Sequence, residues 1–181
     1  MQLISRKGNF DSGHRVMNEK FKCFNVHGHT YLYELVFEFD SMEEVGYNID
    51  FKEIKRVGCQ WIDDLLDHGM ILNPCDIVMR EVCLKIGSKY WLMSLNGESQ
   101  YCNPSVENIA KEVFLAIECL FIGHGGLYLH NVLIHETPNC ATSCSRESID
   151  ESERENFIDC RGKELQEYKE KKGMLEYDDR K

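Results

Sequence analysis

The segment from residue 26 to 39 places the strongest constraint on the fold. Aromatic and β-branched residues dominate it, and two sets of side chains alternate along it, as a β-strand requires. One set is His27, His29, Tyr31, Tyr33, Leu35, Phe37 and Phe39, and the other is Thr30, Leu32, Glu34, Val36 and Glu38. We therefore predict a strand that buries the first set, with both histidines continuing the buried face.

Two further segments precede and follow this strand. Residues 2–15 predict a strand that ends in the polar run Ser12-Gly13-His14-Arg15. Residues 50–66 predict a helix with Asp50 as its N-cap, because apolar residues recur there at helical spacing. Its apolar stripe contains Phe51, Ile54, Gly58, Trp61, Ile62 and Leu65.

The second half of the chain carries one more clear helix and one more clear strand. The helix is expected from about residue 103 to Phe121, ended by Gly123, Gly125 and Gly126. Over residues 127–136, Leu127, Leu129, Asn131, Leu133 and His135 alternate with Tyr128, His130, Val132, Ile134 and Glu136. The order of elements predicts an α+β layer, an antiparallel sheet with two helices on one face. Such a sheet has an open edge, which oligomerisation can cover.

Two segments are less regular. Within residues 71–103 we expect only a short strand at 90–95 and a turn at Asn96-Gly97. From Arg146 onward Glu, Lys and Asp dominate, which indicates a solvated helix or a mobile tail. We therefore expect one domain over residues 1–144, followed by a charged C-terminal helix or tail over 145–181.

Charge and cysteine content limit the classes of function. The formal net charge is -10, which argues against a general nucleic-acid or membrane-surface binder, since both need a basic excess. No apolar run approaches the length of a transmembrane helix, and the N-terminus lacks a signal-peptide pattern. The nine cysteines are irregularly spaced, which favours free thiols and a cytoplasmic protein.

The run His27-Gly28-His29 is the first candidate for chemistry. Alternation puts both imidazoles on one face of the strand, at a spacing of about 6.5–7 Å, so both can reach one metal ion. If the first strand pairs with this one, His14 supplies a third ligand, and three histidines with an open position typify catalytic zinc. The alternative is two strand histidines without a metal.

Cys23 lies four residues before His27. A thiol beside a zinc site is either a fourth ligand, which closes a structural site, or a free base or nucleophile in a catalytic one. The spacing alone leaves both alternatives open, together with that of an inert buried thiol.

Other polar residues are weaker candidates. Asp67 can fix the tautomer of His68 at a helix end, and Glu136 at a strand end can accept two hydrogen bonds from a heterocycle. Arg15 can hold an anion in this acidic chain. Glu107 lies in the first turn of the second helix, where the helix dipole favours an acidic residue. Each of these four has a plain alternative as an ordinary solvated or helix-end group.

Taken together, several short motifs resemble the 6-pyruvoyltetrahydropterin synthase/QueD family. They occur in the family's order and cover roughly residues 2 to 140. The motifs are Phe10-Asp11-Ser12-Gly13-His14-Arg15, Lys22-Cys23-Phe24-Asn25-Val26-His27-Gly28-His29, Asp50-Phe51, Leu66-Asp67-His68, Asn103-Pro104-Ser105-Val106-Glu107-Asn108 and Glu136-Thr137-Pro138. The Cys-x3-His-Gly-His spacing is similar to the bacterial 6-carboxytetrahydropterin synthases, because the animal biopterin enzymes place two more residues there.

The resemblance implies the tunnelling (T-) fold, with subunits joining their sheets into barrels as a hexamer or a tetramer. It implies Zn²⁺ on His14, His27 and His29, and Cys23 as catalytic base. It also implies Asp67 and His68 as a proton relay across a subunit interface, and a substrate site that includes Glu136 as the pterin anchor, with Glu107 and Arg15.

The implied reaction converts 7,8-dihydroneopterin triphosphate to 6-carboxy-5,6,7,8-tetrahydropterin, acetaldehyde and triphosphate, on the route to preQ0 and queuosine-type 7-deazaguanines. Two alternatives stay open. One is pyruvoyl-type synthase activity, and the other is a zinc- and pterin-binding accessory protein without turnover. Cys140 and Cys144 are a further pair of thiols, but two cysteines alone do not make a closed zinc site.

Overall fold

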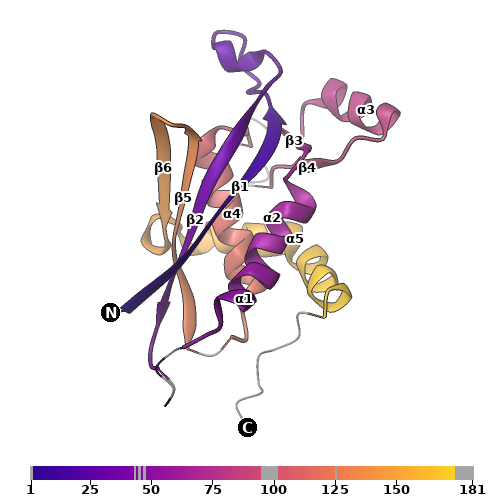
Figure 1. Cartoon of the computed structure of the whole chain (residues 1–181). Coiled ribbons are helices and arrows are strands. Elements are labelled where there is room, and N and C mark those ends of the chain that lie inside the picture. The colour runs from indigo at the N-terminus through magenta and orange to yellow at the C-terminus, as the bar shows by residue number, and fades with distance from the viewer. Residues whose placement is uncertain are drawn as a thin grey trace.

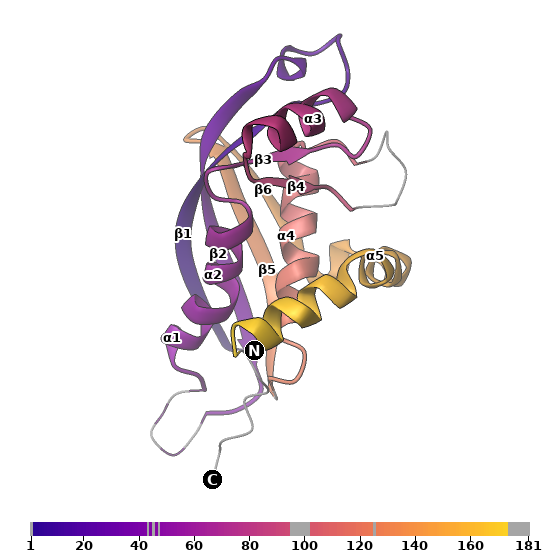
Figure 2. The same ribbon diagram turned by 90° about the vertical axis from the view of Figure 1, so that its right-hand side faces the viewer.

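The computed structural model describes residues 2–42, 44, 46, 48–94, 102–124 and 126–173. One curled sheet forms one layer, and the main helices cover one of its faces, as Figures 1 and 2 show. The expected turn at Asn96-Gly97, the helix-ending Gly125 and the last part of the tail (174–181) lie outside the described residues. None of the described helices is long and apolar enough to cross a bilayer.

The sheet has six strands in the order β4-β3-β1-β2-β5-β6. Its centre is the antiparallel pair of β1 (Gln2–His14) and β2 (His27–Phe39), in which Phe10 pairs with Tyr31 and His14 with His27. The strands β5 (Leu127–Thr137) and β6 (Cys140–Ser145) extend it antiparallel on one side. The predicted strands and the predicted pairing of His14 with the second strand are confirmed.

The predicted face of β2 is the buried one. Tyr31, Tyr33, Leu35 and Phe37 are all buried in the core, where they pack under the helices. On the opposite face, Thr30 and Leu32 are exposed and the three later positions are half-buried. Because the pleat alternates strictly here, His27 and His29 must share the face of Tyr31.

Two helical segments cover that face. The first runs from Phe51 to Leu65 as α1 (Phe51–Ile54), a π-helical turn η2 (Lys55–Cys59) and α2 (Gln60–Leu65), and Asp50 caps it by accepting from the Lys52 N–H at 2.9 Å. Gly58 lets it approach the sheet, since a Cβ there would lie 3.0 Å from Leu35 Cδ1. Phe51 is exposed, so its predicted place in the apolar stripe is wrong.

The second helix, α4 (Val106–Leu120), begins at the Ser105 cap and is almost wholly apolar toward the core. One acid is buried with it. Glu112 accepts hydrogen bonds from the Trp91 indole at 2.9 Å, from the Ser94 N–H at 3.2 Å and from the Ser94 hydroxyl. These three donors satisfy a carboxyl that has no access to solvent.

The segment after His68 folds into a unit of two strands and a helix, of which the sequence predicts only the second strand. Strands β3 (Gly69–Leu72) and β4 (Tyr90–Leu92) run parallel, β3 beside the end of β1, and α3 (Ile77–Ile86) connects them. The predicted short strand at 90–95 is therefore present over its first half. Figure 1 places α3 at the same end of the molecule as the short helix η1 (Lys22–Phe24).

Two β-bulges in β5 determine on which face of the sheet its last residues lie. Val36 pairs with Asn131 and Phe37 with Leu129, so His130 is an extra residue opposite β2. This bulge lets Leu127 and Leu129, and also Val132 and Ile134, face the core, although strict alternation would separate them. A second shift, beside β6, falls at Glu136.

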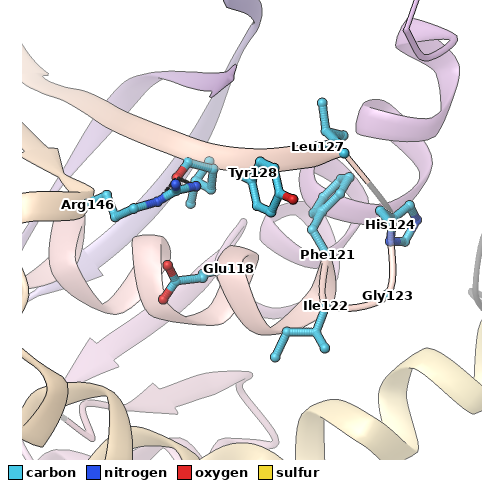
Figure 3. Close-up of a pocket in the computed structure, with 10 residues that line it drawn as sticks. Glu118, Phe121, Ile122, Gly123, His124, Leu127, Tyr128 and Arg146 are labelled. Atoms are coloured by element: carbon cyan, nitrogen blue, oxygen red, sulfur yellow. Dashed lines mark hydrogen bonds between the residues drawn. The ribbon is translucent and has the colours of Figure 1, made fainter. Parts of the chain in front are cut away.

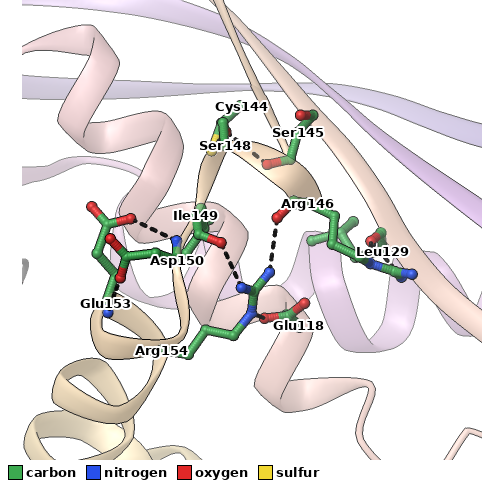
Figure 4. A network of polar contacts seen from close by, with 10 residues as sticks. All are labelled: Glu118, Leu129, Cys144, Ser145, Arg146, Ser148, Ile149, Asp150, Glu153 and Arg154. Atoms are coloured by element: carbon green, nitrogen blue, oxygen red, sulfur yellow. Dashed lines mark hydrogen bonds and ion pairs between the residues drawn. The ribbon is translucent and has the colours of Figure 1, made fainter.

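The charged C-terminal segment is a helix that packs on the core. After η3 (Arg146–Ser148) comes α5 (Glu151–Lys171), which has a capping box of Asp150 and Glu153 and buries Phe157 and Leu165. Figure 4 shows how Arg154 donates to Glu118 at 2.9 Å and to the carbonyls of Ile149 and Arg146 at 2.6 and 3.0 Å. The described part of this segment is therefore a docked helix rather than a mobile tail.

Candidate functional site

Three histidines converge at the end of the central strand pair. His14 comes from the last residue of β1, and His27 and His29 from the start of β2. One ring nitrogen of each lies within 4.8 Å of those of the other two, and the Nε2 atoms of His14 and His27 are 3.1 Å apart. His14 is buried, whereas His27 and His29 are partly accessible from one side.

Backbone carbonyls fix the orientation of two of these rings. His14 Nδ1 contacts the Pro104 carbonyl at 2.6 Å, and His27 Nδ1 contacts the Asn25 carbonyl at 2.7 Å. A carbonyl accepts only, so each Nδ1 carries the proton and each Nε2 is left with a lone pair. Burial lowers the pKa of His14, although the Pro104 carbonyl partly opposes this, and so favours the neutral imidazole that binds metals.

This donor set fits a zinc ion. The Nε2 atoms of His14 and His27 lie 3.1 Å apart. If each carries a lone pair, the two atoms repel each other unless a proton or a cation lies between them. Tetrahedral Zn–N bonds of 2.0–2.1 Å put two ligand nitrogens about 3.3 Å apart, close to the spacing observed here. Hydrogen bonds from Nδ1 to carbonyls are also the usual outer support of histidine metal ligands.

Glu136 closes one side of the histidine cluster. Its Oε1 lies 3.8 Å from Nε2 of His14 and 3.8 Å from Nε2 of His29. The bulge at His130 puts Glu136 on the core face with Val132 and Ile134, and the second bulge leaves it outside the ladder with β6. A carboxylate in this place can be a fourth metal ligand or the anchor of a bound heterocycle.

Tyr31 lies directly behind the cluster. Its ring stacks on Phe10 with centroids 4.9 Å apart and meets His29 and His14 edge-on at 5.6 and 6.1 Å. Burial, followed by the charges of Glu136 and Cys23, raises the pKa of its hydroxyl, which therefore stays protonated.

The loop that carries Cys23 is tied to the rest of the chain by Arg15. The Val16 N–H donates to the Cys23 carbonyl at 2.8 Å, and the Arg15 guanidinium lies 5.0 Å from the centroid of the Phe24 ring. Arg15 also forms a bidentate ion pair with buried Asp76. An anion bound by Arg15 would have to share this guanidinium with Asp76.

Asp67 and His68 form a second group, away from the histidine cluster. His68 Nδ1 contacts Asp67 Oδ2 at 2.6 Å, and Asp67 Oδ1 accepts from the Asp11 N–H at 2.7 Å. Burial raises the pKa of Asp67, but the Asp11 N–H and the His68 ring outweigh it and lower that pKa, so the carboxylate stays ionised. His68 itself has a left-handed backbone, with φ of 53°, which is strained for a residue with a side chain.

This second group lies on the other face of the sheet. Asp11 and Thr30 pair across β1 and β2, and their side chains bond at 2.5 Å on the face opposite to Phe10 and Tyr31. With His68 they line an open groove of about 380 Å³. Within one chain the Asp67-His68 pair is thus a group apart from His14, His27 and His29, although His29 also lines this groove.

One predicted site residue, Glu107, has not yet been placed, and two residues near the site, Asp76 and Tyr31, were not predicted. Glu107 is exposed in the first turn of α4, one turn from the Pro104 carbonyl that supports His14. Asp76 and Tyr31 were not singled out as site residues. The periodicity of β2 marks Tyr31 only as core, and no sequence signal links Asp76 to Arg15.

A separate cavity of about 380 Å³ lies at the far end of β5, between the end of α4 and the start of that strand. Phe121, His124, Tyr128 and Arg146 surround it, as Figure 3 shows. The length of β5 separates Leu127 at this cavity from Glu136, so it is not part of the histidine site.

Comparisons with known proteins agree with this picture. The model of the family described as 6-pyruvoyl tetrahydropterin synthase matches residues 3–147. The 6-carboxy-5,6,7,8-tetrahydropterin synthase of Rickettsia felis is 35% identical over 145 residues, which cover 77% of this chain and 97% of that protein.

Two solved structures share the fold at 18% identity. An uncharacterized protein of Wolinella succinogenes has a TM-score of 0.64 and covers 80% of this chain and 98% of its own. The 6-pyruvoyl tetrahydropterin synthase of Caenorhabditis elegans has a TM-score of 0.52 over 80% and 94%. The predicted α+β T-fold with helices on one face is confirmed, but the sheet is mixed rather than antiparallel as predicted, because β3 pairs parallel with both β1 and β4. The chain belongs to the 6-pyruvoyl tetrahydropterin synthase family.

Proposed function

We propose that this protein is a zinc-dependent 6-carboxy-5,6,7,8-tetrahydropterin synthase. It would convert 7,8-dihydroneopterin triphosphate and water to 6-carboxy-5,6,7,8-tetrahydropterin, acetaldehyde and triphosphate, for queuosine-type 7-deazaguanine synthesis. The observation that carries the proposal is the convergence of His14, His27 and His29, two of them with Nδ1 held by a carbonyl, beside Glu136 and the Cys23 loop.

Glu136 orients the substrate in this proposal. A pterin presents a ring N–H and an exocyclic amino group side by side, and a carboxylate accepts both in a charge-assisted pair. The contacts of Glu136 with His14 and His29 place that anchor next to the proposed metal, so the pterin side chain would lie over the three histidines.

Cys23 is the proposed base. As a thiolate it would take the proton from the side-chain carbon nearest the ring, after which triphosphate leaves by elimination and a retro-aldol step releases the two-carbon fragment. A zinc ion on the three histidines would supply Lewis acidity toward the side-chain oxygens of the substrate.

The Asp67-His68 relay would come from a second copy of the chain. In one chain it is a group apart from the histidines, as described above, but its exposed ring can reach a neighbour's site. The sheet also has two edges to share, at β4 and β6. We infer a homo-oligomer, a hexamer or a tetramer, with active sites between subunits, and within it a domain of residues 1–144 that carries the chemistry.

Two observations favour the carboxy product over the pyruvoyl one. The Cys23-x3-His27 spacing is that of the bacterial carboxy enzymes, and the Rickettsia felis relative, which spans most of the chain, carries that name. Pyruvoyl-type activity is the second candidate. In both readings Glu107 and Arg15 remain predicted substrate contacts, Arg15 through the part of its guanidinium not held by Asp76.

The test is a Cys23→Ala variant compared with Cys160→Ala, an exposed thiol on α5. We expect Cys23→Ala to lose turnover of 7,8-dihydroneopterin triphosphate while its zinc content and melting temperature match the wild type. Cys160→Ala should keep all three. Loss of zinc and of folding in Cys23→Ala would make Cys23 a structural ligand, and unchanged turnover would remove it as the base; either result contradicts the proposal.

A further inference from the structure

Tyr31 has a feature that core packing does not explain. Its side chain is fully buried, yet its hydroxyl has no hydrogen-bond partner among the described residues. A buried hydroxyl without a partner is destabilising, and a phenylalanine would fill the same space without that cost. The neighbouring Tyr33 differs, because its hydroxyl interacts with the Cys59 thiol.

The register of the sheet places Tyr31 beside Glu136. Leu32 of β2 pairs with His135 of β5, so the next positions along the two strands are Tyr31 and Glu136. Residues opposite each other on antiparallel strands share a face, so the side chains of Tyr31 and Glu136 lie on the same side of the sheet. On the other side, the ring is wedged against Phe10, which has no polar group to offer.

Glu136 has acceptor capacity to spare. Its Oε1 now contacts the two Nε2 atoms of His14 and His29, the same nitrogens that the proposed metal would take. Once those nitrogens are occupied, the carboxylate is free to accept from other donors. A carboxylate offers about four acceptor sites, and a pterin uses two of them.

We propose that Tyr31 is a positioning residue for Glu136: its hydroxyl donates to the Glu136 carboxylate and holds it in the orientation that binds the pterin. This inference rests on the function proposed above and adds a residue to its binding site. It explains why a tyrosine is kept at a core position where its hydroxyl finds no other partner.

The test measures binding of neopterin to the zinc-loaded protein by fluorescence titration. We expect Tyr31→Phe to weaken binding about tenfold, since a hydrogen bond to a charged group is lost. Tyr33→Phe, which removes a hydroxyl from the same face of the same strand, should leave the affinity unchanged. Without neopterin, Tyr31→Phe should melt no lower than the wild type, whereas a merely structural hydroxyl would lower the melting temperature.

A double-mutant cycle shows whether Tyr31 acts through Glu136. In a Glu136→Gln background, Tyr31→Phe should add less than about a twofold loss, because the pair is already broken. Additive losses would overturn the inference, as would non-additivity with Cys23→Ser instead of Glu136→Gln. If Tyr31→Phe binds normally while Glu136→Gln does not, only this inference fails. If the wild type does not bind neopterin, the proposed function fails as well.

Discussion

Arg15 and Asp76 form a bidentate ion pair that joins the Cys23 loop to the start of α3. Arg15 Nε lies 2.5 Å from Asp76 Oδ2 and its Nη2 lies 2.8 Å from Oδ1, while Asp76 also accepts from the Met79 N–H as the cap of the helix. Asp76 is buried, and Arg15 is nearly so. The unit β3-α3-β4 therefore holds the loop on which the proposed base lies.

We predict that Asp76→Ala destabilises the protein by about 3–5 kcal/mol, because it leaves a mostly buried guanidinium without its partner. Turnover should also fall, since Cys23 is no longer held in place. Denaturant unfolding and steady-state kinetics measure the two effects. Glu167→Ala, in the exposed Lys163–Glu167 pair, is the control and should change stability by less than about 0.5 kcal/mol. A loss below about 1 kcal/mol for Asp76→Ala would contradict this role.

The metal site gives a second prediction. Purified wild-type protein should hold one zinc ion per chain, and His27→Ala should lose it, because two histidines are too few ligands to retain it. His130→Ala, at the bulge of β5 and 3.7 Å from Glu38, should keep its zinc. Elemental analysis by mass spectrometry gives the metal content. A His27→Ala protein with full zinc would show that the histidine cluster is not the site.

Complementation between subunits tests the third prediction. Cys23→Ala and His68→Ala should each be inactive alone, because one lacks the base and the other the relay. If the relay comes from a neighbouring subunit, co-refolding equal amounts should restore about a quarter of the sites. Activity of the mixture is compared with that of each variant refolded alone. No recovery from well-folded mixed oligomers would place both residues in one subunit's site, against the geometry of the sheet.

Glu112 makes stability depend on pH. Burial raises the pKa of Glu112 above 4.5, although bonds from Ser94 and Trp91 oppose this. A group with a raised native pKa keeps its proton when the unfolded chain has already lost it, so stability falls as the pH rises from about 4.5 through the native pKa. Glu112→Gln has no such proton to keep.

We therefore expect the free energy of unfolding of the wild type to fall relative to Glu112→Gln as the pH rises from 5 to 8. The slope of the difference approaches about 1.4 kcal/mol per pH unit within that window. Unfolding in denaturant at several pH values gives the curves. Glu107 is exposed on the same helix, so the free energy of unfolding of Glu107→Gln should change with pH in the same way as that of the wild type. Parallel curves for Glu112→Gln would show that Glu112 has an ordinary pKa.

Local patterns predict much of this fold. The alternation in residues 26–39 identifies the buried face of β2, and the pairing of His14 with His27 follows from placing the first strand antiparallel to it. The helix cap at Asp50 also follows from the sequence. These features depend on neighbours in the chain, or on two adjacent strands.

The features that sequence reasoning missed depend on long-range contacts. Strict alternation cannot place Leu129 and Ile134 on one face, and only the bulge at His130 shows how Glu136 reaches the histidines. The unit β3-α3-β4 consists of short elements whose apolar residues are largely exposed on α3, so periodicity hardly marks it. The placing of Asp67 beside β1 depends on its hydrogen bond with the Asp11 N–H, a contact across 56 residues that no motif predicts.

The most direct test of the central claim is product analysis by mass spectrometry after the zinc-loaded protein is incubated with 7,8-dihydroneopterin triphosphate. The account predicts 6-carboxy-5,6,7,8-tetrahydropterin and acetaldehyde in equal amounts, with triphosphate released. A pyruvoyl product would contradict the assignment of the carboxy reaction. Folded protein that binds zinc and leaves the substrate unchanged would contradict the claim that this site is catalytic.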